Sequence, residues 1–319
     1  MNPHLSMING HPVLRLQRVL AHPPEKVWTA VTDPDGLAAW FPARVSFDRL
    51  APGAAMRFTF EGPDAPDSGA PETGEILEVD EPKVFAFRWD SDVIRCELLP
   101  HEQGCLLVFS HTLRGPDSDR PSAARHGAGW LLCLDALQAG LDGTTAEFDM
   151  TAWFTHAENL IDLFDLATGH AEPTEHGWQL RFERDLVQPP GEVWQLLTGG
   201  EPPEPGGTAP LPATHGYGHA GPVTESTPPE TLAYSWENGG EVRFALREQH
   251  PIGTRLVLTH TITDPDQRAI LLAAWHTHLE LLFAALHGDV RCPWPAERTE
   301  RLRVRYTEEL AEDGPSGAR

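Results

Sequence analysis

Histidine and arginine side chains recur at matching positions in two stretches of this sequence. His111 and His260 each lie in an S/T-H-T run, FSHTL and LTHTI, and Arg18 and Arg184 each lie in an L-R-x-x-R-x-L run. Imidazole titrates near neutral pH and can act as an acid or a base, so His111 and His260 are the candidate catalytic groups. The other interpretation is structural, with each histidine hydrogen-bonded in a core and each arginine paired with a carboxylate.

Strand alternation places these polar groups on apolar faces. His111 alternates with Leu107, Phe109 and Leu113, and His260 alternates with Leu256, Leu258 and Ile262. Arg18 and Arg184 alternate with leucine and phenylalanine in the same way. Successive side chains of a strand point to opposite faces, so each histidine and each arginine faces the predicted core.

The two stretches belong to an internal repeat. The clearest match is between residues 14–32, LRLQRVLAHPPEKVWTAVT, and residues 180–198, LRFERDLVQPPGEVWQLLT. Three further segments of the first copy have later counterparts in the same order: GEILEVDEPKVFAFRW, GCLLVFSHTL and WLLCLDALQAGLDG. Each copy predicts a strand, a helix opened by Pro-Pro, several alternating strands and a long amphipathic helix. This order predicts an α+β fold in which a helix lies across an antiparallel sheet.

These motifs carry a resemblance to a known family. The first copy resembles the START/pollen-allergen helix-grip superfamily, in particular the bacterial homologues of the heat-shock-protein-90 ATPase activator. The motifs that carry the resemblance are HPPEKVW, DPDGLAAWF, GEILEVDEP, SHTL and HGAGW. The resemblance implies two helix-grip domains, each with an antiparallel sheet wrapped around a long C-terminal helix and a cavity for an apolar ligand between them. Tandem proteins of this length are similar to di-domain members of actinobacterial polyketide and enediyne gene clusters.

The second copy departs from the first after its opening helix. The offset between the copies falls from 166 to 147, so the second copy is 19 residues shorter there. Proline and glycine at the density of GGEPPEPGGTAPLPATHGYGHAG exclude central strands, so we expect two strands to be missing. We expect the rows Tyr234/Trp236 and Leu256/Leu258 to be less covered, and the domains to pack together with the second cavity opening toward the interface. The predicted boundaries are 12–143 for domain 1, 144–176 for a helical linker, 177–290 for domain 2 and 291–319 for a charged tail.

The function that the resemblance implies is the binding of a mostly apolar small molecule, such as a polyketide, polyene or enediyne-type intermediate. Two alternatives stay open: a cyclase- or aromatase-like enzyme using the same cavity, and a co-chaperone. The candidate ligand-binding residues are Arg18, Phe58, Phe60, Phe85, Phe87, Trp89, Phe109, His111, Trp130, Leu134, Arg184, Tyr234, Trp236, His260, Trp275 and Leu279.

The net charge and the motifs of the chain limit which binding partners, metals and cofactors we expect. The formal net charge of −23 argues against nucleic acid and against anionic membrane surfaces. No run of about 18 apolar residues and no secretory signal is visible, so we expect a cytoplasmic protein.

The four cysteines form no C-x-x-C pair, and no metal-ligand or cofactor motif appears, so no metal and no cofactor are predicted. His276 and His278 are two apart on a predicted helix and should face away from each other. The oligomeric state is open.

Overall fold

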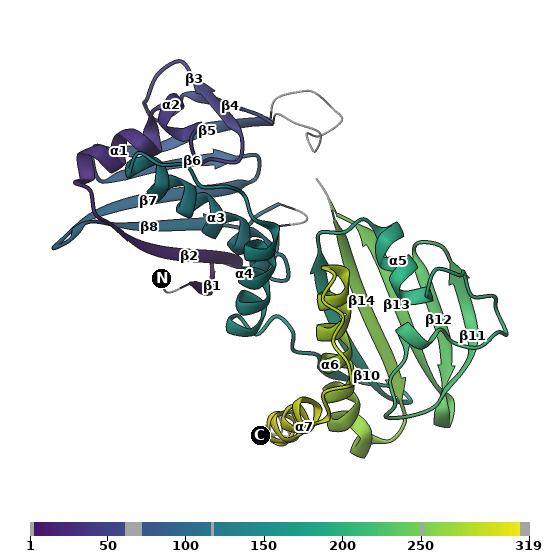
Figure 1. Cartoon of the computed structure of the whole chain (residues 1–319). Coiled ribbons are helices and arrows are strands. Elements are labelled where there is room, and N and C mark those ends of the chain that lie inside the picture. The colour runs from purple at the N-terminus through teal and green to yellow at the C-terminus, as the bar shows by residue number, and fades with distance from the viewer. Residues whose placement is uncertain (1–2, 61–71, 116–117, 250–252, 313–319) are drawn as a thin grey trace. The chain divides into compact units, whose positions relative to one another are not determined.

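The computed structural model describes residues 3–60, 72–115, 118–249 and 253–312. The chain divides into two compact units, Met1–Phe164 and Asp165–Arg319, which are described separately (Figure 1). Each unit contains an antiparallel sheet and a 19-residue helix packed with it, α3 in the first unit and α6 in the second. The predicted α+β class and the two helix-grip domains are confirmed.

The first unit contains an eight-stranded sheet in the order β1-β2-β8-β7-β6-β5-β4-β3. Its strands are β1 (His4–Ile8), β2 (His11–Leu20), β3 (Arg44–Phe47), β4 (Ala55–Thr59), β5 (Glu72–Asp80), β6 (Val84–Trp89), β7 (Asp92–His101) and β8 (Gly104–Thr112). Its helices are α1 (Pro24–Thr32), α2 (Pro34–Leu37), α3 (Ala123–Leu141) and α4 (Met150–Leu163).

The second unit contains a six-stranded sheet in the order β11-β12-β13-β14-β10-β9. Its strands are β9 (His170–Thr174), β10 (Gly177–Leu186), β11 (Ala220–Thr227), β12 (Thr231–Trp236), β13 (Gly240–Glu248) and β14 (Thr254–Ile262). Its helices are α5 (Pro190–Thr198), α6 (Arg268–Leu286) and α7 (Ala296–Glu312), with short 3₁₀ turns η1 (Leu211–Ala213), η2 (Glu237–Gly239) and η3 (Pro265–Gln267).

The strand orders show which elements the second unit lacks. The six strands of the second unit have the same spatial order as six strands of the first, with β9-β10-β14-β13-β12-β11 corresponding to β1-β2-β8-β7-β6-β5. No described strand of the second unit corresponds to β3 or β4. The predicted loss of two strands is therefore confirmed. The residues that replace them form a loop, 199–219, which contains η1.

The expectation that this loss leaves the apolar rows less covered is wrong. Tyr234 and Leu258 are 0% exposed. The loop itself supplies cover, because the hydroxyl of Tyr234 donates to the carbonyl oxygen of Ala213 at 2.5 Å and the ring of His215 packs against Trp275. A segment without strand character thus covers the site that a hairpin would occupy.

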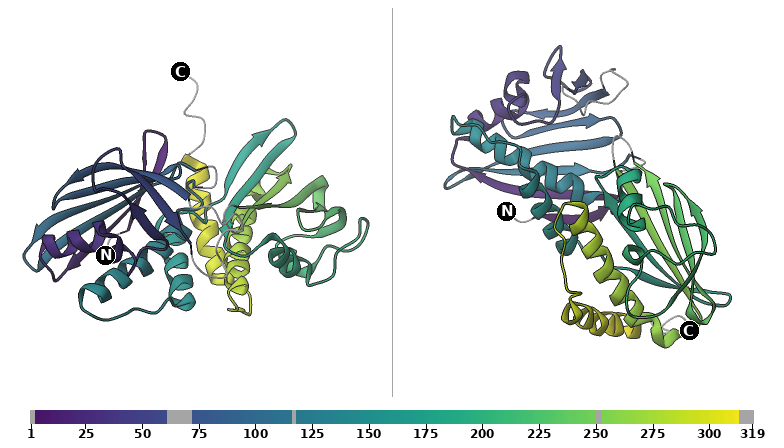
Figure 2. Two further views of the ribbon diagram at one scale, coloured as in Figure 1. Left: turned by 90° about the horizontal axis from the view of Figure 1, so that it is seen from above. Right: turned by 45° about the vertical axis from the view of Figure 1, so that its right-hand side comes forward.

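The repeat extends through the segments predicted as a linker and a tail. β1 and β9 begin 166 residues apart, the same offset as the opening motifs, and α4 and α7 begin 146 residues apart. Helix α4 packs on α3 and α7 packs on α6 (Figure 2). Residues 144–176 therefore contribute α4 to the first unit and β9 to the second, and the described part of 291–319 forms a packed helix; residues 313–319 lie outside the described residues.

Helix α6 is the most apolar helix of the chain. The segment Pro265–Leu286 is long and apolar enough to span a membrane by composition, and most of it is buried inside the structure. Because the sheet covers one side of α6 and α7 the other, this helix needs no polar face. Its apolar character is explained by its position in the core.

Candidate functional site

In the first unit, His111 belongs to a complete hydrogen-bond network. Its Nε2 atom lies 2.8 Å from Oδ2 of Asp92, and its Nδ1 atom accepts a hydrogen bond of 2.9 Å from the indole N–H of Trp130 on α3. The other oxygen of Asp92 accepts the backbone N–H groups of Arg114 and Gly115. Burial raises the pKa of Asp92, but the hydrogen bonds from His111 and from the backbone N–H groups of Arg114 and Gly115 outweigh it and lower that pKa to about 2. Both ring nitrogens of His111 are therefore used by the protein itself.

The second unit keeps the histidine and the tryptophan of this network but lacks the carboxylate. Nδ1 of His260 accepts a hydrogen bond of 2.9 Å from the indole N–H of Trp275. In the register of the hairpins, Gly240 pairs with Trp236 as Asp92 pairs with Trp89. A Cβ atom at Gly240 would lie 2.4 Å from the carbonyl oxygen of Thr261, so no side chain fits at that position. Among the described residues, Nε2 of His260 has no hydrogen-bond partner.

Further unpartnered polar atoms surround the same tryptophan. We define the Trp275 cluster as Trp275, His215, Trp236, His260 and His278. The centroid of the Trp275 ring lies 4.2 Å from His215, 5.3 Å from His278, 6.0 Å from His260 and 6.2 Å from Trp236. Within the described part of the chain, Nε2 of each of the three histidines and Nε1 of Trp236 are buried and have no partner.

Burial keeps the imidazoles of the cluster uncharged. It lowers the pKa of His260 to about 3 and that of His278 to about 4, and it lowers the pKa of His215 well below its usual value. Neutral imidazoles are poor proton donors and, with such low pKa values, poor bases near neutral pH. The cluster is therefore suited to hydrogen bonding rather than to acid–base catalysis. In the described residues, no group of three or more His, Cys, Asp or Glu side chains is placed to hold a metal ion.

The aromatic row predicted in the first unit is packed around one residue that the sequence analysis did not select. The ring of Phe41, which follows α2, lies 5.2–6.0 Å from the rings of Phe58, Phe87, Trp89 and Trp130. Trp89 also donates its indole N–H to Glu72 at 2.6 Å. The predicted residues Phe60, Phe85, Phe109 and Leu134 lie in or beside this packed core. These aromatic side chains therefore pack against one another in the core of the first unit.

The two arginines selected from the sequence, Arg18 and Arg184, are buried and have different partners. Arg18 forms an ion pair of 2.6 Å with Asp135 on α3. Arg184 donates to the backbone carbonyl oxygens of Leu166 and Ala167 and lies over the ring of Phe182. Arg18 fits the structural interpretation, and Arg184 fixes the chain that enters β9.

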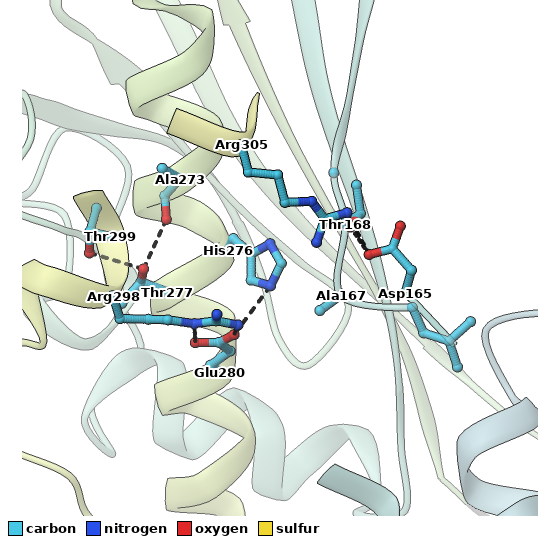
Figure 3. Close-up of polar contacts among 12 residues, drawn as sticks. Asp165, Ala167, Thr168, Ala273, His276, Thr277, Glu280, Arg298, Thr299 and Arg305 are labelled. Carbon is cyan, nitrogen blue, oxygen red and sulfur yellow. Dashed lines mark hydrogen bonds and ion pairs between the residues drawn. The ribbon is translucent and has the colours of Figure 1, made fainter. Parts of the chain in front are cut away.

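A polar network joins α6 to α7 (Figure 3). Nδ1 of His276 lies 2.8 Å from the hydroxyl of Tyr306, and Nε2 lies 3.2 Å from Oε1 of Glu280. Glu280 also pairs with Arg298 at 2.6 Å, and these contacts lower its pKa to about 2 against the effect of burial. His276 and His278 thus face apart, as their spacing predicts.

Sequence reasoning selected part of the Trp275 cluster and missed the rest. Trp236, His260 and Trp275 were predicted, and Leu279 and Tyr234 lie in the same buried core. His278 was noted only for its spacing, and His215 was not selected because its Pro/Gly-rich loop has no periodicity. The sequence itself could have shown that Gly240 stands in the second copy where Asp92 stands in the first, since the two copies align there at an offset of 148 residues.

Comparison with known proteins supports one family. The profile of the family described as "Activator of Hsp90 ATPase homolog 1-like protein" matches residues 21–142 and 192–287, more than half of the chain. No curated protein matches the chain. Similar solved structures include the conserved protein of unknown function EF2215 from Enterococcus faecalis (24% identity, TM-score 0.41, 50% of this chain and 91% of that chain). Another is MLL2253 from Mesorhizobium loti (25% identity, TM-score 0.36, 42% of this chain and 99% of that chain). A third is CalU16 from Micromonospora echinospora (20% identity, TM-score 0.38, 51% of this chain and 96% of that chain).

Proposed function

Because the chain belongs to the family of Activator of Hsp90 ATPase homolog 1-like proteins, we propose that it binds a mostly apolar small molecule in its second unit, between the sheet and α6. The observation that carries this proposal is the contrast between the two histidines. His111 has a partner for both ring nitrogens, whereas Nε2 of His260 has none among the described residues.

The contrast matters because unpartnered polar groups are costly in a protein interior. Each one costs about 1–3 kcal/mol relative to a partnered group. The Trp275 cluster holds four such atoms, on His215, Trp236, His260 and His278. A bound molecule that supplies partners recovers this free energy, so the cluster is suited to a ligand. In the described part of the first unit, a single such atom is found, Nε2 of His126.

The geometry favours binding over turnover. A cyclase would need a group that gains and loses a proton near neutral pH, and His111 and His260 were the candidates. His111 is hydrogen-bonded at both nitrogens, and burial lowers the pKa of His260 to about 3. As the finer ligand class we propose a polyketide, polyene or enediyne-type intermediate, on the family resemblance of the motifs.

The test is a ligand panel applied to the full chain with ¹⁵N-labelled tryptophan. The panel consists of pairs that differ by one carbonyl oxygen: fluorene and fluorenone, diphenylmethane and benzophenone, tridecane and tridecan-7-one. We expect binding to shift the indole N–H resonances of Trp236 and Trp275 and to leave those of Trp89 and Trp130 in place. Binding by no member of the panel, or shifts confined to Trp89 and Trp130, would overturn the proposal.

The finer ligand class has a separate test. Native mass spectrometry of the protein purified from its own host should show a copurifying compound whose mass and fragmentation are those of a polyketide or polyene. A copurifying fatty acid or phospholipid would contradict this class while leaving the binding proposal standing.

A further inference from the structure

The hydrogen bonds already made in the Trp275 cluster determine which polar atoms are donors. Trp275 donates to Nδ1 of His260, and the backbone N–H of Tyr217 donates to Nδ1 of His215 at 3.2 Å. A neutral imidazole carries its proton on one nitrogen only, so the proton lies on Nε2 in both residues. The indole Nε1 of Trp236 is a donor in every state.

Three N–H donors therefore lie together without acceptors. The ring of Trp236 lies 5.2 Å from His215 and 4.9 Å from His260. The three side chains are 7%, 4% and 0% exposed, in the order His215, Trp236 and His260. In the described part of the chain, none of the three N–H groups has a partner. A molecule that completes this site must bring acceptor atoms.

We propose that the ligand of the second unit carries carbonyl oxygen atoms on an apolar body, and that His215, Trp236 and His260 donate hydrogen bonds to them. This inference rests on the proposed function, because it concerns the same site. A carbonyl oxygen accepts two hydrogen bonds and has no proton to place. An alcohol would need an acceptor for its own proton.

The surroundings favour an uncharged carbonyl over a carboxylate. The rings around the three donors are those of Trp275, Tyr234, Tyr217 and Trp294, all uncharged. A buried carboxylate needs a cation or several charge-assisted hydrogen bonds to offset its desolvation. Ketones and polyketones on an apolar skeleton fit this environment.

The first unit offers a direct contrast. At the position equivalent to Trp236, the indole N–H of Trp89 is already used by Glu72. At the position equivalent to His260, Nε2 of His111 is already used by Asp92. A carbonyl oxygen would therefore find these two N–H groups already occupied, so the preference should belong to the second unit alone.

The test compares the two members of each pair in the panel on the full chain, by titration of the indole resonances. We expect each ketone to bind at least about tenfold more tightly than its hydrocarbon, which corresponds to one or more good hydrogen bonds. In the wild-type protein the ketone should also move the N–H proton of Trp236 downfield, as happens when an N–H group enters a hydrogen bond. The hydrocarbon should not.

Two substitutions complete the test. Trp236→Phe should lower ketone affinity about fivefold to tenfold and leave hydrocarbon affinity within about twofold. The control is Trp40→Phe in the first unit, where the indole N–H already donates to the carbonyl oxygen of Ala30. It should change neither affinity. The wild-type comparison stands by itself if Trp236→Phe does not fold.

The outcomes separate this inference from the proposed function. Equal affinity for ketone and hydrocarbon, with binding located in the second unit, would overturn the inference and leave the proposed function intact; this is also the result expected if a buried water satisfies the three donors. Tighter binding of a carboxylate such as fluorene-9-carboxylate than of fluorenone would overturn the choice of an uncharged carbonyl. Binding of neither member would overturn both.

Discussion

Acidification should unfold the second unit before the first. Among the described residues, burial lowers the pKa of four histidines in the second unit, His215, His260, His276 and His278, and of His126 alone in the first. The unfolded chain binds a proton at each histidine below about pH 6.5, whereas the folded chain does so only at much lower pH. The unfolded state therefore takes up more protons, and stability falls as the pH falls below 6.5.

The magnitude follows from the two histidines with the best-defined shifts. The pKa is about 3 for His260 and about 4 for His278, so both stay neutral in the folded unit down to about pH 5. Each then contributes a loss of about 1.4 kcal/mol per pH unit. Relative to about pH 8, the two together have removed about 4 kcal/mol by about pH 5, a large part of the free energy of unfolding of a typical domain.

The assay must report on each unit separately. Urea unfolding of the full chain, followed by the indole resonances of Trp130 and Trp275, gives one transition for each unit. His278→Leu should reduce the pH dependence of the second unit by about one proton, or about 1.4 kcal/mol per pH unit. The control, Leu282→Met on the same helix, keeps every titratable group and should leave the slope unchanged.

Equal slopes for the two units in the wild-type protein would refute this reasoning, since four lowered histidine pKa values must produce a steeper slope than one. A slope of the second unit that His278→Leu leaves unchanged would show that His278 titrates freely in the folded protein. Either result would mean that water reaches the Trp275 cluster.

Three further substitutions test the networks directly by urea unfolding. Asp92→Ala should destabilise the first unit by about 2–4 kcal/mol, because it leaves Nε2–H of His111 and two backbone N–H groups without an acceptor; an unchanged midpoint would contradict the network. Tyr306→Phe should lower the stability of the second unit by about 1–3 kcal/mol, because its hydroxyl links α7 to His276 and to the start of β9, and a loss confined to the first unit would refute this. Arg18→Met should cost no more than about 1 kcal/mol, because Asp135 is 45% exposed and can be hydrated; a loss above about 3 kcal/mol would show that the pair is shielded from water.

The fold of each unit could be predicted from the chain because it depends on local patterns. Pro-Pro at 23–24 and 189–190 opens α1 and α5, since a proline is favoured at the first position of a helix. Alternation placed His111 and His260 on buried faces, since side chains of a strand alternate between two faces. The prolines and glycines of residues 199–219 excluded the missing hairpin, since proline cannot donate to a sheet.

The partners of those side chains were decided by the tertiary structure. Periodicity determines which face a residue occupies, but the atom opposite is set by hairpin register and by loops that have no period. Register pairs His111 with Ile94 and His260 with Val242, so Asp92 and Gly240 each lie two residues before the partner of a histidine. A loop brings His215 onto Trp275. Both ring nitrogens of His111 therefore have partners within the protein, whereas Nε2 of His260 has none among the described residues, although the sequence around the two histidines is similar.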